Sequence, residues 1–368
     1  MRRRIIVVGS GVIGSAIAYE LSSNPQLEIT LIDENDNPGS GATGAALGVL
    51  MGIISLKTKG RAWTLREASV RRYHQLIPEL EELTGLSIPH NKDGTVKLLL
   101  DQEEITKYEK LAQLRASQGY SLQLWDIEKL RQNCPELDIS ATDTKGAVYS
   151  PYDWQVSPTP LTKALVKGAS VKGVQCILGK RVIALRLNKS GVCEGVELEG
   201  HSLSADYVIL ATGLGTTPLV KPLGVDIRIE PVLGQALLLK YDKWSHPEGF
   251  NPVISGDDIH IAPLGDGQFW LGATVEFPSG QESEPTPSPD LLQQLYQRAT
   301  EFYPNLKQAT IMLSWTGQRP HPQGKPAPVI EKLSSHPNVI LATGHYRNGI
   351  LLAPATAQTV RQMIEAEI

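Results

Sequence analysis

The sequence predicts a mixed α/β protein, α+β overall, in which a discontinuous Rossmann-like nucleotide-binding domain carries an inserted domain built on an antiparallel sheet. Three observations predict this fold. A glycine-rich turn follows the first apolar strand, the string V-I-L-A-T-G occurs twice, at 208–213 and 339–344, and apolar residues alternate with polar ones between 225 and 275. A chain of 368 residues is long enough for both domains.

The first unit of the chain carries the nucleotide-binding signal. A strand is expected at 5–8, followed by G-S-G-V-I-G, a helix over 15–21 and a second strand at 29–32 that ends at Asp33. Such a strand, glycine turn, helix and strand with an acid 19 positions beyond Gly14 is the dinucleotide-binding fingerprint. The alternative is a βαβ crossover that only imitates it.

The middle of the chain alternates helical and extended patterns. Apolar residues at helical spacing predict a helix over 65–83, which Pro78 should kink or divide. The other expected elements are a strand at 95–100, helices at 105–114, 127–131 and 159–169, and strands at 175–178, 181–187 and 195–198.

Three apolar strands end in glycine, at Gly9, Gly213 and Gly344. Continuous apolar strands of this kind are typical of a parallel sheet buried on both faces, so we expect all three in one sheet. A proline-rich connector at 281–290 then leads into a helix at 291–302. The predicted nucleotide-binding domain comprises 1–85, 152–222 and 320–368, and the second domain comprises 86–151 and 223–319.

Composition excludes several classes of protein. With 35 basic and 39 acidic side chains, the net charge of −4 disfavours a nucleic-acid binder. Cys134, Cys176 and Cys193 show no C-x-x-C spacing, which argues against a disulfide framework or a metal site and fits the reducing cytoplasm. Glycines interrupt the apolar run after Arg2–Arg4, so a secretory signal is not expected, and no apolar stretch is long enough to span a membrane.

The C-terminal third contains three more specific strings: S-W-T-G-Q-R-P at 314–320, Q-G-K-P-A-P-V-I at 323–330 and G-H-Y-R-N-G-I-L-L-A-P at 344–354. With the N-terminal fingerprint, they resemble the D-amino-acid oxidase superfamily of FAD-dependent amine oxidoreductases, and within it the glycine oxidases that serve thiamine biosynthesis in bacteria. Separation of the glycine-ended strands by inserted blocks also favours FAD over NAD, whose enzymes normally use consecutive βα units.

The resemblance implies where FAD would bind. The glycine turn would surround the pyrophosphate, Asp33 would bind the adenosine ribose, and Val182 would meet the adenine through its backbone. Family glycine oxidases usually have glutamate at the position of Asp33, and a threonine-serine pair where this chain has Thr43 and Gly44. The expected FAD-binding residues are Gly9, Gly11, Gly14, Asp33, Thr43, Val182, Ala211, Gly213, Gly344, Arg347, Asn348, Gly349, Ile350 and Leu351.

Arg319 and His260 are the candidate substrate residues. A planar guanidinium can bind both oxygens of an amino-acid carboxylate, which favours Arg319. His260 stands where the family commonly has tyrosine, and strand alternation places it on one face with Asp258 and Ala262. It either lines the pocket or is an ordinary strand histidine.

The resemblance implies FAD-dependent oxidative deamination of a small amino acid such as glycine or sarcosine. The product is an imine and then a 2-oxo acid plus ammonia, while oxygen becomes hydrogen peroxide. No cysteine follows Cys193, so the flavin should be non-covalent, unlike that of some sarcosine oxidases. The expected partners are a small amine and oxygen, and a homo-oligomer is allowed. Two alternatives stay open: a dehydrogenase that passes electrons to a carrier, and a non-catalytic flavoprotein subunit.

Overall fold

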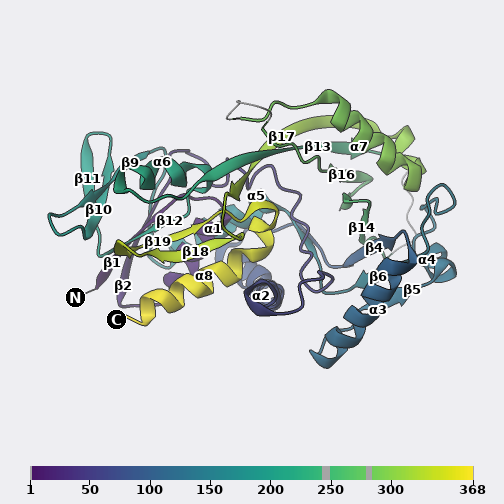
Figure 1. Ribbon diagram of the computed structural model, residues 1–368, viewed down its shortest axis with the longest axis horizontal. Helices are drawn as coiled ribbons and strands as arrows, with labels where there is room; N and C mark the ends of the chain where they lie inside the picture. Colours follow the sequence, from purple (N-terminus) through teal and green to yellow (C-terminus); the bar gives the residue numbers. More distant parts are fainter. Residues whose placement is uncertain (1, 243–248, 279–283, 368) are drawn as a thin grey trace.

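Two large sheets organise the molecule (Figure 1). The computed structural model describes residues 2–242, 249–278 and 284–367, so residues 281–283 of the predicted connector lie outside the described residues. One sheet has six strands in the order β18-β19-β12-β1-β2-β8, and the other has eight in the order β17-β13-β16-β15-β14-β4-β6-β5. This arrangement confirms the predicted fold class.

The six-stranded sheet brings together distant parts of the sequence. Its parallel strands are β1 (Arg3–Val8), β2 (Leu27–Ile32), β8 (Gln175–Ile177), β12 (Tyr207–Leu210) and β19 (His336–Thr343), and β18 (Val329–Leu333) adds an antiparallel edge. The three glycine-ended strands are neighbours, because β12 pairs with both β1 and β19. The prediction that they share one sheet is confirmed.

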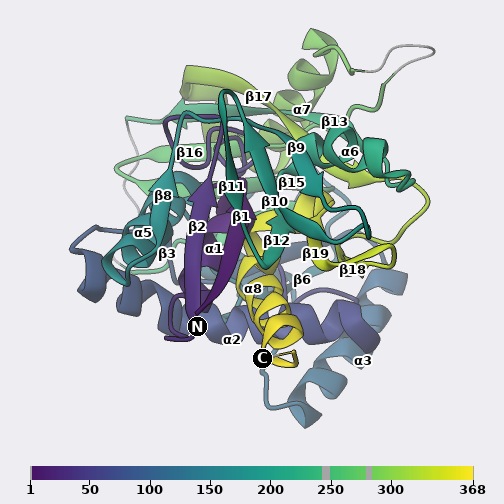
Figure 2. The same ribbon diagram turned by 90° about the vertical axis from the view of Figure 1, so that its left-hand side faces the viewer.

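Both faces of this sheet are covered (Figure 2). On β1, Ile5 and Val7 face the helices, whereas Ile6 and Val8 face a small sheet, as period-two alternation requires. The helices are α1 (Val12–Leu21), α2 (Gly60–Thr84), α5 (Pro158–Val171) and α8 (Gly349–Glu365), and the small sheet comprises β9 (Val182–Leu187), β10 (Cys193–Leu198) and β11 (His201–Ser204). Helix α2 is a single element, so Pro78 does not divide it.

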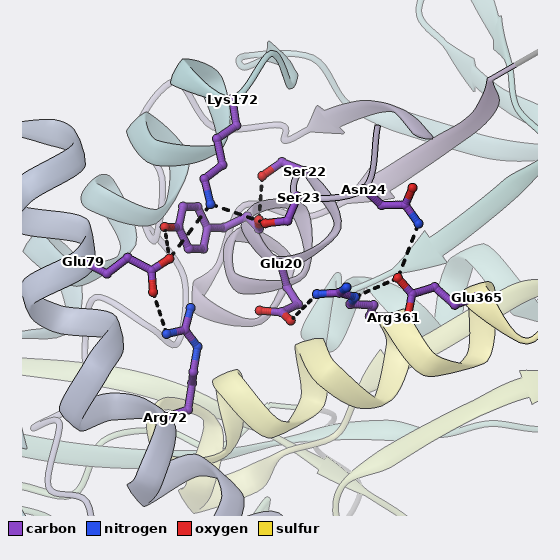
Figure 3. A network of polar contacts seen from close by, with 10 residues as sticks. Glu20, Ser22, Ser23, Asn24, Arg72, Glu79, Lys172, Arg361 and Glu365 are labelled. Carbon is purple, nitrogen blue, oxygen red and sulfur yellow. Dashed lines mark hydrogen bonds and ion pairs between the residues drawn. The ribbon is translucent and has the colours of Figure 1, made fainter. Parts of the chain in front are cut away.

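A polar network fastens helices α1, α2 and α8 together (Figure 3). The Glu79 carboxylate on α2 accepts a hydrogen bond from the Tyr19 hydroxyl on α1 at 2.5 Å and pairs with Arg72 at 2.6 Å. On α8, Arg361 pairs with Glu20 of α1 at 3.2 Å. Burial, and then the hydrogen bond to Glu79, raises the pKa of Tyr19, so this hydroxyl remains a donor.

The eight-stranded sheet packs one face against helices and directs the other toward the six-stranded sheet. It comprises β4 (Thr95–Leu99), β5 (Gln123–Trp125), β6 (Gly146–Ser150), β13 (Ile229–Lys240), β14 (Val253–Gly256), β15 (Ile259–Gly265), β16 (Gln268–Gly272) and β17 (Thr310–Pro322). Among these, the pairs are antiparallel except β14 with β4. Its apolar face packs on α4 (Ile127–Asn133), α7 (Pro289–Phe302) and the 3₁₀ turn η3 (Pro304–Gln308). The predicted domain boundary at 319/320 falls inside β17.

The other face of this sheet is directed toward the six-stranded sheet. Lys97, Ser255 and His260 lie directly opposite one another on β4, β14 and β15. Helix α3 (Gln102–Ser117), strands β3 (His90–Asn91) and β7 (Gln155–Val156), helix α6 (Thr216–Val220) and the 3₁₀ turns η1 (Gly213–Gly215), η2 (Lys221–Leu223) and η4 (Tyr346–Asn348) complete the fold. Among the helices of the described ranges, we find none that is both long and apolar enough to cross a bilayer.

Candidate active site

A cavity of about 1070 Å³ runs from the carboxyl ends of the parallel strands to the face of the eight-stranded sheet that carries Lys97, Ser255 and His260. Asp33 and Val182 line one part of it, and Arg319 and His260 line another. Every predicted site residue except Gly14 lines this cavity. The others on its wall are Gly9, Gly11, Thr43, Ala211, Gly213, Gly344, Arg347, Asn348, Gly349, Ile350 and Leu351.

The glycine turn shows why its glycines are needed. Gly9 adopts φ +101°, and a Cβ there would lie 2.6 Å from the Ala211 carbonyl oxygen. A Cβ on Gly14 would lie 1.8 Å from the Gly9 carbonyl oxygen, so Gly14 acts behind the wall by letting α1 pack against the turn. Gly11 has room in front of it, where only the Thr43 hydroxyl oxygen comes within 4 Å of an added Cβ.

Two helices begin at this cavity. Helix α1 starts after Gly11 and α8 starts after Asn348; neither has a side-chain cap or an acidic residue in its first turn. Helix N-termini present free N–H groups and a partial positive charge, which suit phosphate oxygens and other electron-rich groups. The residues here therefore fit the pyrophosphate of a dinucleotide such as FAD, with Thr43 fixed by its hydrogen bond from the Val12 amide at 3.1 Å.

Asp33 both lines the cavity and supports the turn. Its carboxylate accepts hydrogen bonds from the amides of Ser10 at 2.5 Å and Asn35 at 2.8 Å. The neighbouring Glu34 also lines the cavity and pairs with Arg181 at 3.4 Å. The ribose assignment of Asp33 stays a prediction, since both carboxylates border this end.

Among the described residues, the guanidinium of Arg319 is bound by backbone carbonyl oxygens and not by a carboxylate. Its Nη1 donates to the carbonyl oxygens of Leu233 and Thr274, each at 3.0 Å. Within residues 2–242, 249–278 and 284–367, no carboxylate oxygen pairs with it at salt-bridge distance. Burial, and then the charge of Arg347, lowers the pKa of Arg319. A partly buried cation of this kind favours an incoming anion.

The missing side chain of a glycine, Gly234 on strand β13, leaves room for that guanidinium. Gly234 on β13 lies opposite Gly317 on β17. A Cβ on Gly234 would come within 2.2–2.5 Å of the guanidinium atoms of Arg319, and one on Gly317 would lie 2.3 Å from the Ala45 Cβ. Sequence reasoning missed Gly234, because a glycine opposite another glycine in a long strand carries no motif.

His260 borders the same part of the cavity. Its Nδ1 is buried and has no hydrogen-bond partner among the described residues. Burial, and then the charge of Arg347, lowers the pKa of His260 to about 4, so the ring is neutral near pH 7. Asp258, two positions earlier, pairs through both carboxylate oxygens with Arg347, at 3.0 and 2.9 Å.

Residues 51–55 form a further wall that sequence reasoning missed. The buried carboxylate of Asp153 accepts hydrogen bonds from the amides of Gly52, Ile53 and Ile54 at 2.6–2.8 Å. Arg115, also buried, donates to three carbonyl oxygens of residues 53–57. Asp153 thus binds amide groups of this wall and Arg115 binds its carbonyl oxygens, and no sequence pattern singles out either residue.

Comparison with known proteins agrees with this geometry. The chain is 28% identical to a glycine oxidase of Bacillus licheniformis, covering 99% of this chain and 94% of that protein. It is 33% identical to a bifunctional protein ThiO/ThiG of Nostoc sp., covering 99% of this chain and 53% of that protein. The crystal structure of glycine oxidase from Geobacillus kaustophilus superposes with a TM-score of 0.86 at 26% identity, over 100% of this chain and 96% of that one.

The family described as FAD dependent oxidoreductase matches residues 4–363, almost the whole chain. The two helix N-termini and the glycine turn fit the cofactor that this family uses. The protein is therefore an enzyme of the D-amino-acid oxidase family of FAD-dependent oxidoreductases.

Proposed function

We propose that this enzyme oxidises a small amino acid, glycine or sarcosine in the first instance, at its amine-bearing carbon. The observation that carries the proposal is Arg319: a partly buried cation, bound only to carbonyl oxygens, that borders the cavity fitted to FAD. An amino-acid carboxylate would satisfy it bidentately. The likeness to glycine oxidases supports the small substrate.

FAD, when bound, supplies the hydride acceptor; the protein supplies orientation and exclusion of water. Arg319 holds the substrate carboxylate and so fixes the position of the carbon next to it. His260, neutral near pH 7, offers the substrate amine an acceptor and adds no positive charge that would repel an ammonium group. The overall balance is amino acid plus oxygen plus water giving a 2-oxo acid, hydrogen peroxide and the released amine, which is ammonia from glycine and methylamine from sarcosine.

Arg319 provides the direct test. In the FAD-loaded enzyme, Arg319→Ala should weaken glycolate binding, followed by the flavin spectrum, by roughly 2–5 kcal/mol, the usual cost of truncating one partner of a buried charge pair. Arg319→Lys should recover only part, because an ammonium cannot match both oxygens in one plane. FAD content should stay normal. Unchanged glycolate affinity in Arg319→Ala would remove the amino-acid assignment.

Reduction of the flavin separates this proposal from the two alternatives. Mixed anaerobically with a panel of small amines, the enzyme should lose its yellow colour with at least one of them and regain it on admission of oxygen, with one hydrogen peroxide per turnover. Reoxidation only by an artificial electron carrier would instead indicate a dehydrogenase. A flavin that no amine reduces would indicate a non-catalytic subunit.

A further inference from the structure

The guanidinium groups of Arg319 and Arg347 both border the part of the cavity next to His260. Among the residues that the structure describes, only one of them is paired with a carboxylate. Arg319 is bound to carbonyl oxygens, whereas Arg347 forms a two-point ion pair with the Asp258 carboxylate, at 3.0 and 2.9 Å. The two arginines are close enough for the charge of Arg347 to lower the pKa of Arg319. Two neighbouring guanidinium groups that were both free would suit a dianion, and of this pair only Arg319 lacks a carboxylate partner within the described ranges.

The position of Asp258 follows from a tight hairpin. Strands β14 and β15 are joined by two residues, Asp257 and Asp258, with φ of +49° and +60°, as a two-residue turn of the primed type requires. Asp258 projects into the cavity, where it meets Arg347 of the turn η4, which follows strand β19 of the six-stranded sheet. The Asp258 side chain is 68% exposed. Desolvation beside Arg347 works against ionisation, but the hydrogen bonds and charge of Arg347 lower the pKa of Asp258, so it is a carboxylate near pH 7.

Asp257, the other residue of the hairpin turn, also forms an ion pair with an arginine, but away from the cavity. Its carboxylate pairs with Arg298 of α7, whose Nε lies 2.7 Å from Oδ2, and it does not line the cavity. The hairpin thus carries two aspartates in the same backbone conformation, each bound to one arginine. Only the second can affect what the cavity binds.

We propose that Asp258 is a specificity-determining residue: by occupying Arg347, it restricts the cavity to substrates with a single carboxylate. This inference rests on the proposed function, because it takes Arg319 as the site of that carboxylate. Removing the negative charge of Asp258 frees Arg347 as a second anion-binding group next to Arg319. The enzyme should then accept amino acids with two carboxylates.

The test compares Asp258→Asn with Asp257→Asn in the FAD-loaded enzyme. Both substitutions keep the side-chain shape, and asparagine tolerates positive φ. Acetate and malonate, which cannot be oxidised here, are titrated by the change in the flavin spectrum. We expect the malonate-to-acetate affinity ratio to rise by about tenfold or more in Asp258→Asn, as close charge pairs generally allow. In Asp257→Asn it should equal the wild-type ratio.

A second variant identifies the group responsible. Asp258→Asn combined with Arg347→Met should return the ratio to the wild-type value, because the freed guanidinium is gone. An unchanged ratio in Asp258→Asn, an equal rise in Asp257→Asn, or a rise that persists in the double variant would each overturn the inference. The proposed function is checked separately, by acetate binding to the wild type and its loss in Arg319→Ala. If acetate binds through Arg319 but the malonate-to-acetate ratio does not rise in Asp258→Asn, the inference about Asp258 is wrong and the proposed function stands.

Discussion

Arg319 owes its position to a missing side chain. Gly234 leaves the space that the guanidinium fills, with 2.2–2.5 Å between an added Cβ and the guanidinium atoms. Gly234→Ala should therefore displace Arg319 and weaken glycolate binding by about tenfold or more, a loss of roughly 1.4 kcal/mol. Titration of the flavin spectrum measures it.

A double-substitution cycle supplies the control for Gly234. In the Arg319→Ala background the added methyl group meets no guanidinium, so Gly234→Ala should then have little further effect. Additive losses would show that Gly234 acts on binding independently of Arg319.

His260 makes the free energy of unfolding depend on pH. Its folded pKa of about 4 lies below an unfolded value of about 6.5. Above pH 6.5 the ring is neutral in both states and has no effect. As pH falls from 6.5 to 4, the unfolded chain binds the proton first, so the free energy of unfolding should fall by up to about 1.4 kcal/mol per pH unit.

His260→Gln removes this titration. Urea unfolding of variant and wild type at pH 7.5 and 5 should show the variant gaining stability relative to the wild type at the lower pH. The other charged groups facing the ring, Arg347, Asp258, Lys97 and Arg319, are present in both proteins. A difference that does not change with pH would contradict the neutral imidazole.

At the scale of helices, Glu79 is the centre of the network that fastens α2 to α1. It receives the Tyr19 hydroxyl at 2.5 Å and the Arg72 guanidinium at 2.6 Å. Glu79→Ala should lower the free energy of unfolding by roughly 1–2 kcal/mol, since it leaves a half-buried hydroxyl and a guanidinium without their acceptor. The urea midpoint reports the change.

Glu103 is the comparison for Glu79. It pairs with Lys107 one helical turn away, and its side chain is 76% exposed. Because such exposed pairs contribute little, Glu103→Ala should stay within about 0.5 kcal/mol of the wild type. Equal losses in the two variants would show that the network adds nothing beyond an ordinary surface pair.

Elements with local signals were predictable from the sequence. The three glycine-ended strands were expected in one sheet because apolar runs followed by glycine indicate buried strands that turn at the same edge, and β1, β12 and β19 confirm it. Of the kink or division expected at Pro78, the division does not occur. Proline removes only one backbone hydrogen bond, and packing of Leu76, Ile77 and Leu80 in the core keeps α2 whole.

Contacts between distant side chains were not predictable. Asp258 and Arg347 are 89 positions apart, and their meeting depends on a hairpin turn on one sheet and a helix start on the other. Arg319 was recognisable as a carboxylate-binding candidate, but its carbonyl partners and the gap at Gly234 arise from strand pairing alone. The periodicity of a strand or helix shows which of its residues lie on the same face. It does not show which side chain of another element they contact across the cavity.

For the molecule as a whole, attachment of the flavin is the simplest property to test. Cys134, Cys176 and Cys193 do not line the cavity, and burial raises the pKa of each thiol, which disfavours the reactive thiolate. Purified protein should be yellow, and denaturation alone should release all of the flavin into the supernatant. Colour that remains on the precipitated chain would indicate a covalent bond.

The order of strands in the six-stranded sheet has a consequence for synthesis. Strand β1 leaves the ribosome first, yet its neighbour β12 begins at Tyr207, and β19, which pairs with β12, begins at His336. At about 5–20 residues per second, roughly 15–65 s separate the first strand from the last. Until Tyr207 is made, the glycine turn lacks the neighbouring strand β12, and until Gly349 is made, the start of α8 is still untranslated. A ribosome-bound chain should therefore bind flavin only after the start of α8 at Gly349 has emerged.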